Sequence, residues 1–216
     1  MKQASPRNFT TSSDGSLTMW VPKLDEHYHS IHGAKTESQH VFIDAGLAAI
    51  DKDAVSILEV GLGTALNAKL TMEQKGDKAI DYYALEKFPL SPSEISEIKE
   101  LGHETEAQIL GIAPGEKQEV IPGFQFELST KDLREFAVET PKFDLIYFDA
   151  FAPSAQPELW SEEIFQNMYN ALLPGGALVT YCAKGVVKRT MKAVGFEVEA
   201  LPGPPRKREM TRAWKR

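Results

Sequence analysis

The sequence predicts an α/β protein with a doubly wound, mostly parallel sheet of seven strands and a small N-terminal extension. From Val55 onward, short apolar runs alternate with helical patterns, which is typical of parallel strands joined by crossover helices. The last two runs are joined only by Pro202-Gly-Pro-Pro205, which indicates an antiparallel pair at the sheet edge. We expect residues 1–50 to form a hairpin and helix extension, and residues 51–216 to form the main domain.

The elements follow from local signals. Asp14-Gly15, in the middle of a threonine-rich stretch, predicts a hairpin within residues 8–21, and a helix is expected over residues 36–50. Ser91-Pro92-Ser93-Glu94 has the order of a capping box and predicts the start of a helix. The expected strands are residues 55–60, 79–85, 125–128, 143–148, 177–182, 196–201 and 208–213. The other expected helices are residues 64–76, 131–137, 158–172 and 186–194.

Composition excludes several classes of protein. The chain has 216 residues, of which 42% are hydrophobic and 25% charged, as in a single soluble domain. A single cysteine, Cys182, excludes an internal disulfide and a cysteine-based zinc site. The histidines His27, His29, His32 and His40 are irregularly spaced, so we expect no metal. The sequence shows no signal peptide and no apolar run of membrane-spanning length, so we expect a cytoplasmic protein without a membrane segment.

The charge is unevenly distributed. The formal net charge is −7, yet the chain from Lys184 onward contains ten basic and three acidic residues, a net +7, which leaves −14 for the rest. This division indicates a basic face on an acidic body, which can attract phosphates. The alternative is a solvated basic tail. The candidate phosphate contacts are Lys184, Lys188, Arg206, Lys207 and Arg208.

A glycine loop follows the first strand of the main domain. It reads Glu59-Val-Gly-Leu-Gly63-Thr64, with Asn67 three residues later, and its glycines let the backbone pass close to a ligand. The third glycine of a dinucleotide fingerprint, expected near Leu66, is missing. Glu59 would repel a pyrophosphate but attract a sulfonium cofactor with a cationic amino-acid end. The loop therefore favours S-adenosylmethionine over NAD; the alternative is a tight turn that binds nothing.

Two more acids follow the next strands. Glu86 can accept hydrogen bonds from both ribose hydroxyls, or it is a solvated loop acid. Asp132 can reach an adenine amino group, or it caps the short helix at residues 131–137. The predicted cofactor-binding residues are Glu59, Gly61, Gly63, Thr64, Asn67, Glu86, Asp132 and Asp149.

The fourth strand leads into Asp149-Ala-Phe151-Ala-Pro153, the candidate reaction site. Asp149 can accept a hydrogen bond from a target amine and orient its lone pair, and Phe151 can stack on a base. The alternative is that Asp149 caps a loop and Phe151 packs in the core. We predict Asp149 and Phe151 as the catalytic residues.

Five segments together resemble a known family. They are Tyr28-His-Ser-Ile-His-Gly-Ala34, Glu37-Ser-Gln-His-Val-Phe-Ile43, the Glu59-to-Asn67 loop, Asp149-Ala-Phe-Ala-Pro153 and Gly203-Pro-Pro-Arg-Lys-Arg-Glu-Met210. Over nearly the whole chain they resemble the methyltransferase domain of bifunctional tRNA 5-methylaminomethyl-2-thiouridine biosynthesis proteins and its stand-alone bacterial relatives. The family loop usually reads Gly-Thr-Gly-Leu-Asn, so Ala65 stands at its third glycine, and Ala150 replaces a glycine common after the aspartate.

The resemblance implies a Rossmann-like class I methyltransferase fold and methyl transfer from S-adenosylmethionine to the 5-aminomethyl nitrogen of a tRNA wobble uridine. It implies that the predicted loop acids and glycines bind the cofactor, that Asp149 and Phe151 serve the base, and that the basic terminal stretch meets the anticodon arm. In 216 residues we expect a monomer that performs only methyl transfer, without an oxidase domain. The alternatives are a small-molecule methyltransferase, an aminopropyltransferase that uses decarboxylated cofactor, and a non-catalytic nucleotide-binding module.

Overall fold

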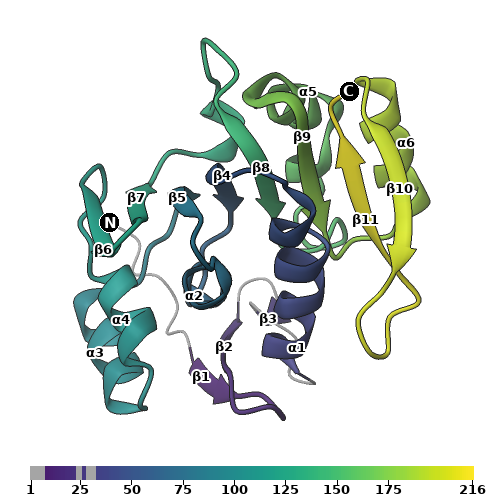
Figure 1. The fold of residues 1–216 in the computed structure, drawn as a ribbon. Helices are drawn as coiled ribbons and strands as arrows, with labels where there is room; N and C mark the ends of the chain where they lie inside the picture. Colours follow the sequence, from purple (N-terminus) through teal and green to yellow (C-terminus); the bar gives the residue numbers. More distant parts are fainter. Residues whose placement is uncertain (1–7, 23–25, 28–32) are drawn as a thin grey trace.

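The computed structural model describes residues 8–22, 26–27 and 33–216, which form an α/β fold around one large sheet (Figure 1). The sheet order is β10-β11-β9-β8-β4-β5-β7-β6. Its parallel centre consists of β4 (Ala54–Val60), β5 (Ala79–Leu85), β7 (Phe124–Ser129), β8 (Phe143–Phe148) and β9 (Leu172–Thr180). All six residues of β8 are buried, which explains why this strand is the most apolar in sequence. The predicted doubly wound, mostly parallel fold is confirmed.

The large sheet has eight strands, so the prediction of seven was wrong by one. The additional strand is β6 (Lys117–Ile121), which pairs antiparallel with β7. Its sequence, Lys-Gln-Glu-Val-Ile, lacks an apolar alternation because β6 is an edge strand with mostly exposed side chains. Pairing with β7, and not its own pattern, makes this segment a strand.

The predicted antiparallel pair at the other edge is confirmed. β10 (Glu197–Pro202) pairs with β11 (Glu209–Trp214), and β11 also pairs antiparallel with β9. The last strand in the chain therefore lies between β9 and β10. Because β11 is antiparallel to β9, the turn between β10 and β11 lies at the same end of the sheet as the carboxyl end of β9.

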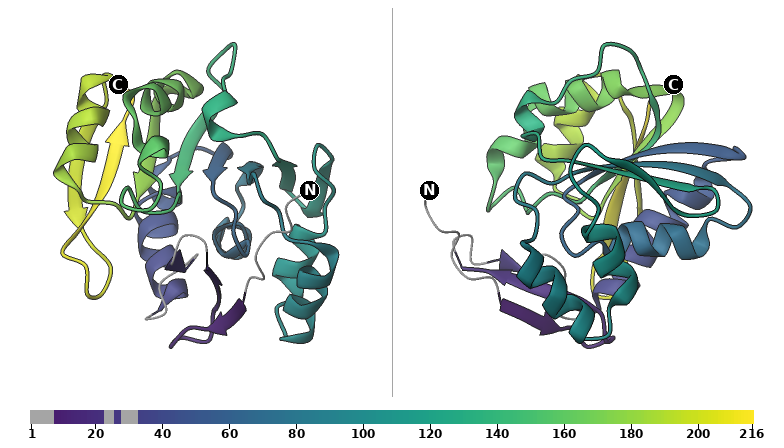
Figure 2. Two further views of the ribbon diagram at one scale, coloured as in Figure 1. Left: turned by 180° about the vertical axis from the view of Figure 1, so that it is seen from behind. Right: turned by 90° about the vertical axis from the view of Figure 1, so that its left-hand side faces the viewer.

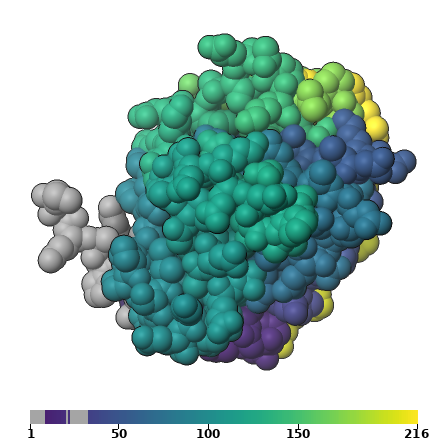
Figure 3. Space-filling model, turned by 60° about the vertical axis from the view of Figure 1, so that its left-hand side comes forward, coloured from purple at the N-terminus to yellow at the C-terminus, as the bar shows by residue number. Residues whose placement is uncertain are grey.

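Helices cover both faces of the sheet (Figure 2). On one face α2 (Leu66–Gln74), α3 (Pro92–Glu100) and α4 (Glu104–Leu110) contribute to a core with Ile57, Tyr82 and Tyr147. On the other, α5 (Glu162–Ala171) and α6 (Gly185–Ala193) pack on Leu58, Phe148 and their neighbours. The capping box predicted at Ser91 and Glu94 is present at the start of α3. Teal residues of the region that contains α3, α4, β6 and β7 occupy the middle of the surface in Figure 3, and purple residues of the N-terminal hairpin lie at its lower margin.

The N-terminal extension contains the predicted hairpin. β1 (Asn8–Thr11) and β2 (Leu17–Val21) pair antiparallel, and β3 (Glu26–His27) adds to β2. Leu17 and Met19 are buried in the same core as the main sheet. In Figure 1 the hairpin lies beyond the carboxyl ends of the parallel strands, which is where ligands bind in sheets of this type.

The segment predicted as one helix over residues 36–50 is divided. It consists of α1 (Ala34–Ser38), π-helical turns η1 (Gln39–Asp44) and a 3₁₀ turn η2 (Leu47–Ala49). Gly46 ends the helical run: a Cβ built on it would lie 2.3 Å from the carbonyl oxygen of Phe42. Close packing at this glycine, which the periodicity of the apolar residues does not reveal, limits the helix.

Two 3₁₀ turns occur where the sequence predicted helices. The helix expected at residues 131–137 is a single 3₁₀ turn, η3 (Leu133–Glu135), and the helix expected from Glu158 is a 3₁₀ turn, η4 (Pro157–Trp160), followed by α5. Short turns of this kind leave backbone groups that side chains must satisfy. Asp132 and Ser161 do so as N-caps of η3 and α5.

Candidate active site

The glycine loop between β4 and α2 is shaped by residues in the left-handed region. Gly61 has φ 87° and Gly63 has φ 55°. A Cβ on Gly61 would lie 2.7 Å from the carbonyl oxygen of Asp149, so this position needs glycine for close approach as well as for its φ. Ala65, the residue at the family's third glycine, has φ 64° and is the N-cap of α2. The loop therefore keeps a glycine-like conformation at Ala65 despite the side chain.

The loop brings Glu59, Asn67 and Asp149 together, although they come from three separate elements. The Asn67 amide donates from Nδ2 to Glu59 Oε1 at 2.9 Å and to Asp149 Oδ2 at 2.8 Å. The Asp149 backbone N–H donates to the carbonyl of Val60, so the loop after β8 extends the β4–β8 pairing by one residue. One neutral amide thus joins two carboxylates at the carboxyl ends of adjacent strands.

Both carboxyl groups hold their protons more tightly than usual. Burial raises the pKa of Glu59 well above its ordinary value, and the charge of Asp149 adds to the effect. Burial also raises the pKa of Asp149 to about 7, with Glu37 adding to the rise while the Asn67 hydrogen bond and Lys207 oppose it. A carboxyl group that titrates near neutrality is typical of functional sites.

The site fits a cofactor with a cationic amino-acid end. Glu59 Oε2 and Asn67 Oδ1 are buried acceptors with no hydrogen-bond partner within residues 8–22, 26–27 and 33–216. Such acceptors are costly to leave unpaired. An ammonium group is rich in donors and its positive charge would favour ionised Glu59 and Asp149. Among the described residues, this end of β4 and β8 is short of hydrogen-bond donors and positive charge, both of which an ammonium group would supply. A pyrophosphate would instead add negative charge beside the two carboxyl groups.

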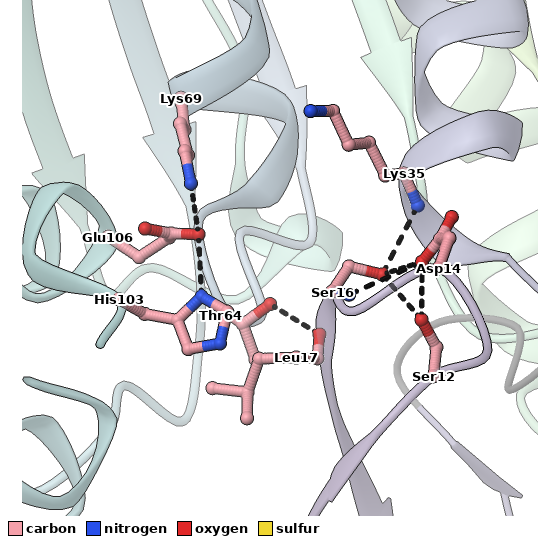
Figure 4. Close-up of polar contacts among 9 residues, drawn as sticks. All are labelled: Ser12, Asp14, Ser16, Leu17, Lys35, Thr64, Lys69, His103 and Glu106. Atoms are coloured by element: carbon pink, nitrogen blue, oxygen red, sulfur yellow. Dashed lines mark hydrogen bonds and ion pairs between the residues drawn. The ribbon is translucent and has the colours of Figure 1, made fainter. Parts of the chain in front are cut away.

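Two other predicted cofactor residues contact the loop. Glu86 accepts from the backbone N–H of Gly63 at 3.3 Å and from that of Phe88 at 2.9 Å, so its carboxylate lies at the loop. Thr64 is buried, and its hydroxyl donates to the carbonyl of Leu17 at 3.5 Å (Figure 4). Thr64 thus connects the glycine loop to the N-terminal hairpin.

The hairpin is in turn fixed to α1. The Asp14 carboxylate accepts from the hydroxyls of Ser12 and Ser16 (Figure 4). It also accepts from the backbone N–H of Thr36 at 3.1 Å. These hydrogen bonds lower the pKa of Asp14, although burial opposes them. The hairpin turn, the start of α1 and the glycine loop therefore form one connected unit.

Asp132 lies after β7, as predicted, and acts there as a cap. Its carboxylate accepts from the backbone N–H of Arg134 at 3.0 Å and forms ion pairs with the side chains of Arg134 and Lys87. These contacts lower its pKa well below the ordinary value, and the Arg134 hydrogen bond contributes most. The capping alternative considered from the sequence is realised here; a contact with adenine stays a prediction.

Two aromatic residues that the sequence did not single out hold the loop after β8. Trp160 donates from Nε1 to the carbonyl of Phe151 at 2.8 Å, and the Tyr181 hydroxyl donates to the carbonyl of Ala150 at 2.7 Å. Phe151 is half-buried, so its ring is partly accessible. No local pattern connects Trp160 or Tyr181 with this loop, because the contacts run to backbone carbonyls 9 and 31 positions away.

The predicted phosphate contacts fall into two groups. Lys184, Arg206 and Arg208 are exposed, with no ion pair among the described residues. Lys188 forms an ion pair with Glu209 at 2.8 Å, and Lys207 one with Glu37 at 2.7 Å. Arg212 and Arg216 likewise pair with Glu199 and Glu197. The exposed positive charge of the terminal segment is therefore smaller than its sequence count.

Other ligand classes find little support in the described part of the chain. It contains no group of three or more His, Cys, Asp or Glu side chains arranged to hold a metal ion. His29 and His32 lie outside the described residues, and Cys182 is buried. Within the same residues, none of the helices has the length and apolar character needed to span a bilayer.

The fold and the site together define an α/β protein in which hydrogen-bond acceptors and two carboxyl groups gather at the carboxyl ends of β4 and β8. The family of S-adenosyl-L-methionine-dependent methyltransferases matches residues 96–216. The chain belongs to this family, and its cofactor is S-adenosyl-L-methionine.

Curated relatives are more specific. The chain is 32% identical, over 90% of its length, to the tRNA 5-methylaminomethyl-2-thiouridine biosynthesis bifunctional protein MnmC of Leptospira interrogans, of which it covers 33%. It is 30% identical, over 88% of its length, to the protein of the same name from a Marinomonas species, of which it covers 31%. The chain thus spans about a third of the length of these relatives.

Solved structures agree on the fold. MNMC2 from Aquifex aeolicus superimposes with a TM-score of 0.76 at 24% identity, covering all of this chain and 72% of that one. Spermidine synthase from Thermotoga maritima superimposes with a TM-score of 0.62 at 13% identity, and the match covers 96% of this chain and 67% of the synthase. At these identities the comparisons support the α/β fold alone.

Proposed function

We propose that this protein is an N-methyltransferase that converts 5-aminomethyl-(2-thio)uridine at the wobble position of tRNA into 5-methylaminomethyl-(2-thio)uridine. The observation that carries the proposal is Asp149, a half-buried carboxylate with a pKa near 7 that lies against the glycine loop of the cofactor site. The similarity to the tRNA-modifying relatives extends over nine-tenths of the chain and includes this loop.

Each predicted cofactor residue has a proposed role. Glu59 and Asn67 would bind the cationic amino-acid end, with the loop of Gly61, Gly63 and Thr64 beneath the cofactor. Glu86, already directed at the loop, would bind the ribose hydroxyls. Asp132 would border the adenine.

Asp149 and Phe151 would handle the target base. S-adenosylmethionine supplies an electrophilic methyl group on its sulfonium centre. A free amine is protonated at neutral pH, and its lone pair becomes available only after it loses a proton. Asp149 can accept that proton or a hydrogen bond from the amine because its pKa lies near 7. Phe151, held through its carbonyl by Trp160, would stack against the base.

The exposed cations of the C-terminal region would contact the anticodon arm. Lys184, Arg206 and Arg208 are the exposed members of the predicted set that form no ion pair among the described residues, while Lys188 and Lys207 are already paired. A tRNA substrate would place the reaction in the cytoplasm. We also propose that the protein acts as a monomer.

A direct assay tests the reaction. The protein is incubated with S-adenosylmethionine and tRNA that carries the aminomethyl precursor, and the nucleosides are analysed by mass. We expect the precursor to gain one methyl group. An enzyme that leaves this nucleoside unchanged but transfers a group to a polyamine or another small molecule would establish the rival assignment on the same fold, and binding without turnover would establish a nucleotide-binding module.

The RNA surface can be tested by reversing charge. An Arg206→Glu/Arg208→Glu variant should bind tRNA at least tenfold more weakly at low salt and lose part of the salt dependence of binding, because each phosphate contact adds to that dependence. The matched control is Arg189→Glu, which reverses one exposed charge on α6 outside the predicted set. Equal affinities and salt slopes in all three proteins would show that the basic surface is only solvated.

A further inference from the structure

An ion pair links the two ends of the chain beside the active site. Glu37 belongs to α1, and Lys207 to the turn between β10 and β11; Lys207 Nζ lies 2.7 Å from Glu37 Oε1. The Glu37 side chain is only 18% exposed, whereas that of Lys207 is 38% exposed. The pair is therefore partly shielded from solvent, and its charges act on their surroundings more strongly than those of a surface pair.

Contacts fix this pair to the loop that carries Asp149. The Lys207 ammonium lies 4.7 Å from the centroid of the Tyr181 ring, and the Tyr181 hydroxyl donates to the carbonyl of Ala150 at 2.7 Å. The turn itself is tight: the Lys207 N–H donates to the carbonyl of Pro204, and Arg206 has φ 72°. Lys207 is thus held on the active-site side of the turn, between α1 and the loop after β8.

Both members of the pair act on Asp149. Glu37 repels its ionised form and Lys207 attracts it. The other titratable groups that interact with Asp149 include Glu59 on β4 and Tyr82 on β5, both fully buried behind Asn67 and the strand ends. Glu37 therefore acts on Asp149 from α1, whereas Glu59 and Tyr82 act on it from strands of the sheet.

An amine in this site needs more than one acceptor. A primary amine that presents its lone pair to the methyl group directs two N–H bonds away from it, and the methylated product is a secondary ammonium with two N–H bonds. We propose that Glu37 is a second substrate-facing carboxylate, which accepts one N–H of the target amine beside Asp149, and that Lys207 is the positioning residue that holds it in place. This inference rests on the proposed function.

The charges and protons balance in this arrangement. With both acids ionised and Lys207 protonated, the three side chains sum to one negative charge, which a bound alkylammonium neutralises. One proton passes from the nitrogen to the Asp149 carboxylate and later to water. The nitrogen then bonds to the methyl carbon as the bond from that carbon to sulfur breaks, which leaves a neutral thioether and a cationic amine product beside Glu37.

A purely mechanical role is the alternative. The pair also joins the C-terminal turn to the N-terminal helix, as does the contact between His40 Nε2 and the carbonyl of Pro202 at 2.8 Å. If the ion pair only held the C-terminal turn against α1, removing either Glu37 or Lys207 would weaken the same contact. The two variants would then change activity in the same way, and neither would move its pH dependence.

The test compares Glu37→Gln with Lys207→Met in the 216-residue chain. The pH profile of kcat/KM for precursor tRNA is measured at saturating S-adenosylmethionine. Loss of the negative charge of Glu37 favours ionised Asp149, so the acidic limb should move to lower pH; loss of Lys207 should move it to higher pH. Glu37→Gln should also lower kcat/KM by roughly tenfold to a hundredfold, as expected for a lost hydrogen bond to a charged group.

Controls separate the possible outcomes. Glu199→Gln breaks a comparable ion pair, with Arg212 at 2.8 Å, away from Asp149, and should leave the limb in place. Glu37→Asp keeps the charge and should retain the limb position, which also covers the case in which Glu37→Gln folds poorly. If the wild-type protein is active and the acidic limbs of Glu37→Gln and Lys207→Met shift in the same direction or stay in place, the inference about Glu37 is overturned while the proposed function stands. A wild-type protein that does not methylate the precursor would overturn the proposed function and the inference with it.

Discussion

The loops after β7 and β8 have equivalent places in the fold but opposite electrostatics. Each follows a buried parallel strand, and each contains an acid. Asp132, after β7, contacts the cations Lys87 and Arg134, and its pKa is lowered well below the ordinary value. Asp149, after β8, receives a hydrogen bond from the neutral amide of Asn67, and burial raises its pKa to about 7.

The difference shows that position at a strand end does not by itself make an acid reactive. An adjacent cation stabilises the ionised form and holds it as a structural anion, whereas burial beside a neutral amide leaves the charge poorly compensated. Lys207 opposes this effect at Asp149 only partly, because its charge is shared with Glu37. The chemistry of the site therefore depends on which side chains the fold places around each acid.

The largest expected effect is on turnover, after substitution of Asp149. Asp149→Asn keeps the size of the side chain but removes the proton acceptor, and kcat should fall by roughly a hundredfold to ten-thousandfold. Wild-type kcat/KM should rise with pH through about 7, because the ionised carboxylate is the active form. Nucleoside analysis by mass gives the rates, and isothermal titration should still detect S-adenosylmethionine binding.

The same substitution at the other loop is the control. At saturating S-adenosylmethionine, Asp132→Asn should leave kcat within roughly threefold of wild type, because a residue that contacts only the cofactor or caps a turn changes binding rather than turnover. If Asp149→Asn were as active as Asp132→Asn, the opposite pKa shifts of the two acids would have no bearing on catalysis.

An intermediate effect is expected from Asn67, the amide shared by the two buried acids. Asn67→Leu removes both N–H donors and leaves Glu59 Oε1 and Asp149 Oδ2 without this partner. The free energy of unfolding should fall by about 1–3 kcal/mol, the cost of leaving a buried polar group unpaired. Urea denaturation at pH 7 measures it.

Asn170→Leu is the matched control for this change. Asn170 lies on the exposed side of α5 and accepts a hydrogen bond from Gln166 at 3.1 Å. A surface change of this kind should alter stability by less than about 0.5 kcal/mol. Similar losses at positions 67 and 170 would show that the buried amide has no special role.

The smallest effect is on stability at Asp132, and its pH dependence has a definite sign. The pKa of Asp132 is lowered from an ordinary value of 3.8, so ionised Asp132 stabilises the fold above that pH and loses this contribution as the pH falls below it. Asp132→Asn should therefore cost about 1 kcal/mol at pH 7 and much less near pH 3. Thermal melts across this range measure the difference.

Asp149→Asn should show the opposite dependence. Its raised pKa means that ionisation costs stability, so the wild-type protein should lose stability as the pH rises from about 4 to 7, and the variant should lose less. If stability depended on pH in the same way in Asp132→Asn and Asp149→Asn, the electrostatic difference between the two loops would be contradicted. A tenfold loss of S-adenosylmethionine affinity in Asp132→Asn would assign that acid to the cofactor as well as to the cap.

Much of the fold could be predicted because its signals are local. The apolar run Phe143–Phe148 is a strand over the predicted residues, and the capping box at Ser91 begins a helix. The loop acids follow their strands as expected, since strand order along the chain fixes where each connection begins. β6 escaped prediction because an exposed edge strand carries no apolar pattern.

The details of the site could not be read in this way. Trp160 and Tyr181 hold the loop of Asp149 through backbone carbonyls, and such contacts leave no mark on the spacing of residues. The sequence also counted Lys207 among the phosphate contacts, although the fold pairs it with Glu37 from a segment 170 positions away. That pairing depends on the antiparallel packing of β11 against β9, which places the turn before β11 at the carboxyl end of β9.

The sequence by itself determined the class of fold, the glycine loop behind Glu59 and the acids at the strand ends, because periodicity and turn chemistry act between near neighbours. Only the tertiary structure decided the state of each acid: a half-buried carboxyl with a raised pKa at Asp149, an N-capping anion at Asp132 and an ion-paired carboxylate at Glu37. The physical reason is that the protonation of an acid depends on burial and on charges within a few ångströms, and those neighbours come from distant parts of the chain.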